Sequence, residues 1–407
     1  MTRHHRAVQR SLSPRAAAAA IATVFFVNGA TFASWSPRLP ELQDELGVSD
    51  AALGLTLLGG GLGGLAASSV SGWLVDRRGS RAVTVATSAA LSLWLPLIGV
   101  VPSAAAFFAV LIGLGALDGL TDVAMNAQAV ALQRRARRSI ITRFHALWSA
   151  GAVVGGIVAS RAAAAEISLR TQLFVTGGVL CVATVVAARW LLPGRPPAAE
   201  VVTAGGPTAV RGPTPRPVFL QLFLLGGAIA LAELPPNDWA ALMMNDRFDL
   251  TSGQAGLGFV ATASGMLVGR LVGDWTADRV GVERTRRGGA VVATAGIVIA
   301  TTVPSPIGAG CGLFIAGLGL STLFPLMFRS ASELTRGSHS GMAAFSSGAR
   351  LGFLVASPLV GLIAEPLSVA TSVLLVSGLA AAGVAVARLP TRAPATVPGP
   401  RAVTPSS

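Results

Sequence analysis

The 407-residue sequence contains no tyrosine and only two cysteines and four histidines, and every basic residue is arginine. Cys181 and Cys311 are isolated in apolar segments, so they indicate neither a disulfide nor a metal site. Charged residues make up 12% of the chain, about half the proportion found in soluble proteins. So few charges cannot cover a globule of this size with a polar surface. This scarcity argues against an ordinary soluble fold and indicates a surface in contact with lipid.

Apolar residues are abundant: they make up 52% of the chain, and the mean hydropathy is +0.66. The 48 glycines suit helices that pack closely in a membrane. The net charge of +13 comes from short arginine clusters between apolar runs, without a recognisable nucleic-acid motif. We therefore expect a lipid bilayer as partner, and no nucleic acid.

Apolar runs long enough to cross a bilayer occur twelve times, which predicts an all-α membrane protein of twelve transmembrane helices in two pseudo-symmetric six-helix bundles. The predicted spans are residues 16–36, 51–74, 82–101, 104–131, 141–160, 170–192, 218–243, 253–275, 288–305, 307–330, 341–363 and 367–388. The predicted units are a tail (1–15), an N-terminal bundle (16–192), a Pro/Gly-rich linker (193–217), a C-terminal bundle (218–389) and a second tail (390–407).

Arginines concentrate in the N-terminal tail, in the linker and in alternate loops, whereas the first loop on the opposite side is acidic. By the positive-inside rule, this pattern predicts that both termini and the linker face the cytoplasm. The first apolar run is long and further spans follow, so we interpret it as an uncleaved helix rather than a signal peptide.

The two halves also resemble each other in sequence. A shift of 202 residues places residues 46–55 over residues 248–257, and DRRG at Asp76–Gly79 over DRVG at Asp278–Gly281. Internal repeats of this kind are typical of secondary transporters, whose substrate site lies at the repeat interface.

The loop after the second span reads GWLVDRRGSR, with Gly72, Asp76, Arg77, Gly79 and Arg81 at fixed spacing. This motif resembles the signature loop of the major facilitator superfamily, and the likeness covers essentially the whole chain. Segments such as DGLTDVAMNAQA and ELPPNDWAAL are similar to a bacterial branch near the fucose-permease-like members. The resemblance implies a transporter of the bacterial plasma membrane that works by alternating access, not an enzyme, with no cofactor and no metal.

The second copy of the motif keeps Asp278, Arg279 and Gly281 but has Asp274 and Glu283 where the family has glycine and a basic residue. In the family this loop is a conformational latch, in which aspartate and arginine pair across the gap between the halves. The alternative is that the arginines only set topology.

Asp118, Asp122 and Asn126 lie four residues apart on one helix face within the fourth span. Buried carboxylates are costly in hydrocarbon, so this face is expected to look into a water-filled cavity. We interpret Asp118 or Asp122 as the group that takes up a proton, and Asn126 as a hydrogen-bonding partner. The alternative for Asp122 is a structural pair with a latch arginine such as Arg77.

The seventh span contains Pro235 and Pro236, which are expected to break it, with Glu233 before the break and Asp238 after it. Glu233 is a candidate substrate or proton group. Asp238 is a second candidate, or a solvated residue at the end of the span.

Four further polar residues lie within or near spans. Arg350 is expected to face an anionic substrate or an acidic group, or else to extend to the cytoplasmic surface. Arg270 is expected to be structural. His145 can relay protons or pack, and Asn28 can bind substrate or pack.

These observations favour a monomeric, proton-coupled transporter of a small organic solute. Few amide groups lie in the spans, so export of a drug-like compound or secondary metabolite is preferred over uptake of a sugar or other nutrient. A sensor built on a transporter scaffold is the remaining alternative.

Overall fold

The computed structural model describes residues 13–136, 140–193, 214–335 and 339–389, and every regular element in these ranges is helical. The N-terminal half contains α1 (Pro14–Ala33), η1 (Ser36–Arg38), α2 (Leu39–Leu46), α3 (Asp50–Arg78), α4 (Ser80–Trp94), η2 (Leu95–Val100), α5 (Ala104–Ala136), α6 (Ile141–Ala164), α7 (Leu169–Ala187) and η3 (Ala188–Trp190). The C-terminal half contains α8 (Arg216–Asp238), α9 (Ala240–Phe248), α10 (Ser252–Ala255), α11 (Leu257–Val280), α12 (Val282–Thr302), α13 (Pro306–Leu320), α14 (Leu323–Leu334), α15 (His339–Ala364), α16 (Val369–Val373), the π-helical turn η4 (Leu374–Gly378) and α17 (Leu379–Val386).

Within the described ranges, eleven helical segments are long and apolar enough to cross a membrane. The predicted ninth span corresponds to α12, which is not among the eleven. Its first two turns carry Glu283, Arg284, Arg286 and Arg287, and these charges shorten its apolar part. The arrangement of twelve predicted spans thus matches the helices of the structure, although one of them is less apolar than the rest.

The repeat seen in the sequence is also a structural repeat. The helix α3 follows the N-cap Ser49 and ends before Gly79, whereas α10 and α11 follow the N-cap Thr251 and end before Gly281. Gly79 has φ 84° and ψ 144°, and Gly281 has φ 92° and ψ 148°. This backbone conformation favours glycine, so the glycine of the motif has the same structural reason in both copies.

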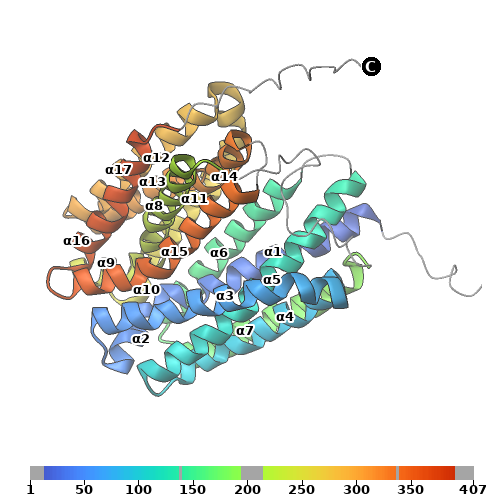
Figure 1. Cartoon of the computed structure of the whole chain (residues 1–407). Coiled ribbons are helices and arrows are strands. Elements are labelled where there is room, and N and C mark those ends of the chain that lie inside the picture. The colour runs from blue at the N-terminus through green and yellow to red at the C-terminus, as the bar shows by residue number, and fades with distance from the viewer. Residues whose placement is uncertain (1–12, 137–139, 194–213, 336–338, 390–407) are drawn as a thin grey trace, which may run out of the picture.

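The two halves lie side by side (Figure 1) and touch most closely at one end. We call this the far end, and we call the opposite end, where α1 begins and α3 finishes, the linker end. At the far end, Gly361 of α15 lies against the carbonyl of Asp50, and the N–H of Ala51 donates to Oε2 of Glu365 at 3.1 Å. On the other side of the molecule, Gly253 of α10 packs on Ala164 of α6.

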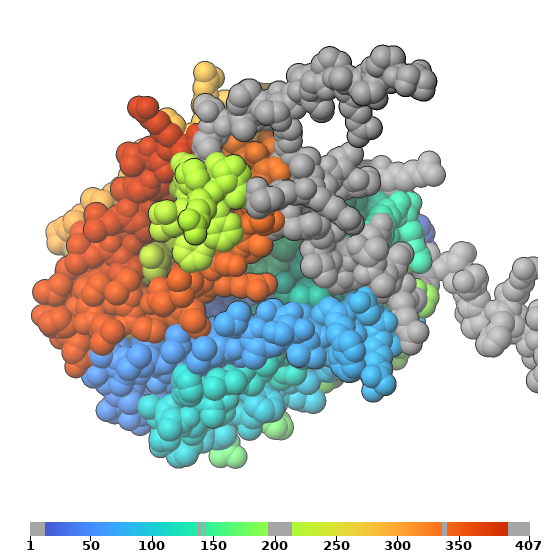
Figure 2. Space-filling model, in the orientation of Figure 1, coloured from blue at the N-terminus to red at the C-terminus, as the bar shows by residue number. Residues whose placement is uncertain are grey.

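Toward the linker end the halves separate. Figure 2 shows a hollow between α15, in orange, and α3, in blue, with part of α6 visible at its floor. The structure is therefore closed at the far end and open at the linker end. This shape places the residues of both bundles that face the midline around one common space.

The proline pair does not break the seventh span where the sequence predicted. The helix α8 continues through Pro235 and Pro236 to Asp238, and the interruption comes at Trp239. Pro235 has no N–H to donate to the carbonyl of Leu231. The hydroxyl of Ser377, from η4, donates to that carbonyl instead, at 3.1 Å. A donor from another helix thus stabilises the proline-containing turn.

Candidate functional site

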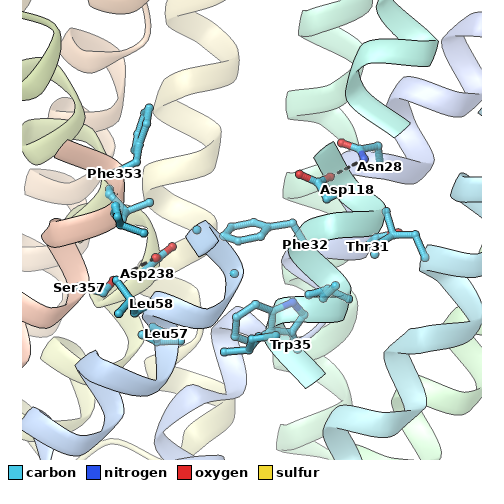
Figure 3. Close-up of a pocket in the computed structure, with 18 of the residues that line it drawn as sticks. Asn28, Thr31, Phe32, Trp35, Leu57, Leu58, Asp118, Asp238, Phe353 and Ser357 are labelled. Carbon is cyan, nitrogen blue, oxygen red and sulfur yellow. Dashed lines mark hydrogen bonds between the residues drawn. The ribbon is translucent and has the colours of Figure 1, made fainter. Parts of the chain in front are cut away.

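A cavity of about 240 Å³ lies between the halves, near the middle of the long helices. Residues of α1, α3, α5 and α6 form one side of it, and residues of α8 and α15 form the other. Its walls are mostly apolar, with four aromatic side chains: Phe32, Trp35, Trp148 and Phe353. Figure 3 shows Phe32, Trp35 and Phe353 around the cavity. Polar groups are few and stand at opposite sides of the cavity, an arrangement typical of ligand pockets.

The polar group of the N-terminal half is a chain of three side chains from three helices. Nδ2 of Asn28 donates to Oδ1 of Asp118 at 2.7 Å, and Nε1 of Trp148 donates to Oδ1 of Asn28 at 2.7 Å. Asn28 is buried, whereas Asp118 is exposed to the space between the halves. Asn28 is therefore fixed by both neighbours and holds the carboxylate of Asp118 toward the cavity.

The polar group of the C-terminal half is Asp238, at the end of α8. Its Oδ2 accepts a hydrogen bond from the hydroxyl of Ser357 at 3.4 Å, and both residues line the cavity. Within the described part of the chain, Oδ1 of Asp238 and Nε1 of Trp35 are buried without a hydrogen-bond partner. Both residues line the cavity, so one acceptor and one donor beside it have no partner among the described residues.

Arg270 of α11, which we expected to be structural, connects the two halves beside this cavity. Its guanidinium donates to Oγ of Ser149 on α6 and lies 5.3 Å from the ring centroid of Trp148. It also lies 3.9 Å from Oε1 of Glu233 on α8. Sequence reasoning missed this role because the contact joins residues from different bundles. No local sequence pattern marks such a contact.

Asp122 and Asn126 continue the face of Asp118 toward the linker end. Asp122 is exposed, and its Oδ1 accepts a hydrogen bond from Nδ2 of Asn126 at 2.9 Å. Among the described residues, Asp122 forms no ion pair with Arg77 or any other arginine. Neither Asp122 nor Asn126 lines the cavity itself, so the three residues share a face but not one site.

The other candidates are placed as follows. The ring of His145 packs edge-on against Phe25, with centroids 5.4 Å apart, outside the cavity. Glu233 also lies outside the cavity lining and faces Arg270. Arg350 is exposed on α15, one turn before Leu354 on the linker side, and has no partner among the described residues.

The two motif copies have the same local structure. Arg77 lies 5.3 Å from the ring centroid of Trp73, and Arg279 lies 4.2 Å from that of Trp275, two positions related by the 202-residue shift. Oδ1 of Asp76 is buried and accepts no hydrogen bond within the described ranges. In this state, with the linker end open, no ion pair across the gap is recorded between the described residues of the two copies.

Glu283, which departs from the motif, has a local role. It pairs with Arg286 at 2.8 Å and with Arg287 at 2.6 Å, while Arg286 also donates to the carbonyls of Val384 and Ala387. Burial raises the pKa of Glu283, but hydrogen bonds and charge from the two arginines outweigh it and lower the pKa below its usual value. This cluster ties the start of α12 to the end of α17.

Two helical bundles with a cavity at their interface are the architecture in which secondary transporters place their substrate site. The sequence profile of the Major Facilitator Superfamily matches residues 21–344 and 239–406. The chain belongs to the major facilitator superfamily and is a multi-pass membrane transporter, not an enzyme.

Similar proteins agree with this assignment. The chain is 30% identical over 363 residues to an uncharacterized MFS-type transporter of Yersinia pestis, covering 89% of this chain and 92% of that protein. It is 28% identical to the membrane protein MosC of Rhizobium meliloti, covering 88% and 86%. Two solved structures share the fold: a variant of the nucleoside transporter NupG (TM-score 0.71, 13% identity, 90% and 97% covered) and the fucose:proton symporter FucP of E. coli (0.57, 15%, 90% and 96%).

Proposed function

We propose that this protein is a secondary active transporter that uses the proton gradient to move a small organic solute by alternating access. The observation that carries the proposal is Asp118. Its carboxylate lies near the middle of a span, is exposed to the space between the halves, and is held there by Asn28. A carboxyl in this place can exchange protons with water on whichever side the cavity opens.

Coupling requires that the charge of Asp118 affects the contact between the halves. The hydrogen bonds that link Asp118, Asn28 and Trp148 end at the indole ring of Trp148. The guanidinium of Arg270, from the other half, lies over the same ring. Protonation of Asp118 weakens its bond to Asn28, and the change reaches the Trp148–Arg270 contact through fixed neighbours. Asp122 is an alternative proton site on the same face. Glu233 forms an ion pair with Arg270 and so affects the strength of the Trp148–Arg270 contact.

The lining of the cavity favours export of an amphiphilic compound over uptake of a sugar. Aromatic and aliphatic side chains dominate it, and among the lining side chains only Asn28 carries an amide. A sugar would leave most of its hydroxyl groups unpaired there, which costs free energy for each one.

The arginine distribution supports an orientation with the linker end in the cytoplasm of a bacterial plasma membrane. On that orientation the structure is an inward-open state, and the two motif copies form the latch that closes the cytoplasmic end in the alternate state. We propose that the monomer is the transporting unit, because one chain contains the whole cavity.

The test uses the purified protein in liposomes that contain a pH-sensitive dye. Candidate compounds, both toxic amphiphiles and sugars, are added outside under an imposed pH gradient. Compound-dependent proton movement that is absent from empty liposomes is expected. If the compounds cross through the protein without any change of internal pH, proton coupling is wrong. The sign of the pH change separates exchange from symport, and a symport response to a sugar would establish uptake.

A further inference from the structure

The cavity between the halves has a definite charge. Two of its lining residues are ionisable, Asp118 on one side and Asp238 on the other, and both are acids. Arg270 is not part of the lining: it lies beyond the ring of Trp148 and faces Glu233. Arg350 is not part of the lining. With both acids ionised, the cavity attracts a cation and repels an anion.

The lining also contains groups without partners. Oδ1 of Asp238 is buried and accepts no hydrogen bond from the described residues. Nε1 of Trp35 likewise has no acceptor among the described residues. Trp35 lines the cavity and is only 6% exposed. A buried polar atom without a partner is costly, so both atoms favour a ligand that supplies a donor to one and an acceptor to the other.

On the basis of the transport function, we propose that the substrate is a small organic cation: a protonated amine with an aromatic or apolar body and one hydrogen-bond acceptor. The ammonium group binds Asp238 and interacts with Asp118, the body packs against Phe32 and Trp148, and the acceptor binds Nε1 of Trp35. Aromatic faces attract cations, which adds to the carboxylates. The volume, about 240 Å³, suits a compound with one ring.

A cation in this cavity competes with the proton for Asp118. Binding of the amine favours the ionised carboxylate and so releases a proton, and protonation of Asp118 weakens binding of the amine. Charge balance thus couples amine and proton in opposite directions, which is the arrangement that export against the proton gradient requires.

The test is calorimetry on the full chain in lipid nanodiscs, at a mildly alkaline pH, with four probes that share one ring. Phenylethanolamine carries the amine and the hydroxyl, phenethylamine lacks the hydroxyl, phenylethanediol is neutral and mandelate is anionic. We expect phenylethanolamine to bind at least ~10-fold more tightly than the diol, since hydrogen bonds to charged groups are the stronger kind. Phenethylamine is expected to bind a few-fold more weakly, and mandelate not measurably.

Two variants and one control make the assignment specific. Asp238→Asn is expected to remove most of the preference for the amine over the diol. Trp35→Phe is expected to remove the difference between phenylethanolamine and phenethylamine. Asp246→Asn changes an exposed carboxylate of α9 outside this cavity and is expected to leave all four affinities unchanged.

Equal binding of amine and diol, tighter binding of mandelate, or no binding of any probe would overturn the substrate class. None of these results contradicts proton coupling by itself, because the liposome assay detects proton movement with a neutral or anionic solute as well. Proton-free transport of the amine would leave the substrate class intact and overturn the proposed function instead.

Discussion

In both halves of the molecule, glycines at equivalent positions form the contacts between crossing helices. In the N-terminal half, Gly29 and Gly151 bring α1 against α6; in the C-terminal half, Gly226 and Gly348 bring α8 against α15. The same number of residues separates each glycine from its counterpart (226 minus 29, and 348 minus 151). At both crossings a Cβ would overlap with a backbone carbonyl of the facing helix. The packing of the bundles is therefore a duplicated feature.

The polar groups of the site do not repeat. Asn28 and Trp148 lie next to the glycines of the α1–α6 crossing, so the spacing of the glycine pairs gives their counterparts in the C-terminal half. These are Leu225 and Phe345, which are 5% and 0% exposed. The position that corresponds to Asp118, 202 residues later, is Leu320, which is 1% exposed. In the other direction, Arg270 corresponds to Ser68. Residues that preserve the repeat form the scaffold, and residues that break it form the site.

The largest effect is expected from removing the ionisable group that the N-terminal half contributes to the cavity. Asp118→Asn keeps the size of the side chain but cannot ionise, so we expect it to abolish pH-driven accumulation of substrate. Exchange of substrate without a gradient should remain in part, because exchange needs no net proton movement. Both activities are measured in liposomes, with Asp246→Asn as control. Undiminished accumulation would remove Asp118 from the coupling role and turn attention to Asp122.

The reciprocal change tests the other half. Leu320→Asp places a carboxylate at the position that corresponds to Asp118. The counterparts of its polar neighbours are the apolar side chains of Leu225 and Phe345. An unpaired buried charge costs several kcal/mol, so we expect little folded protein. The recovery of a monodisperse peak and its melting temperature are the measurements, with Leu320→Met as the control for size. A Leu320→Asp variant as stable as the parent would mean that this helix face is accessible to water in both halves. The two halves would then not differ in the polarity of this face.

The sequence was sufficient for the scaffold because its signals are local. Spans follow from apolar run length, and the repeat follows from the spacing around Gly79 and Gly281. The exposed face of Asp118 and Asp122 followed from helical periodicity and the cost of buried charge.

Other features could not be predicted because they depend on residues from distant helices. The contact of Arg270 with Ser149 and Trp148 exists only when the halves meet, and no local pattern marks it. The continuity of α8 through Pro235 depends on Ser377, far along the chain. The absence of Glu233 from the cavity lining likewise follows from tertiary packing.

Glycine substitutions at the duplicated crossings test whether the two halves are equally tight. We expect Gly151→Ala and Gly348→Ala each to lower stability by about 1–3 kcal/mol, because the added Cβ overlaps with the carbonyl of Phe26 or Phe223. Thermal unfolding in detergent measures this, with Gly178→Ala as control, since a Cβ there meets nothing within 4 Å. A large loss in one half and none in the other would show that the crossings are not equivalent in energy.

The smallest expected effect concerns the π-helical turn η4, a feature absent from the described residues of the N-terminal half. Ser377→Ala removes the donor to the Leu231 carbonyl that Pro235 leaves unpaired, and we expect a loss of about 1 kcal/mol. Ser372→Ala is the matched control, since that buried hydroxyl bonds only to the carbonyl of Val369 on its own helix.

A double-mutant cycle separates this explanation from a general packing defect. In the Pro235→Ala background, the N–H of residue 235 can donate to the Leu231 carbonyl, so Ser377→Ala should cost less there than in the parent protein. An equal cost in both backgrounds would mean that Ser377 stabilises the turn by packing alone. The continuity of α8, which positions Asp238 in the cavity, would then need another cause. A reduced cost would tie the placement of Asp238, the proposed substrate-binding carboxylate, to a hydroxyl on a π-helical turn without a counterpart among the described residues of the other half.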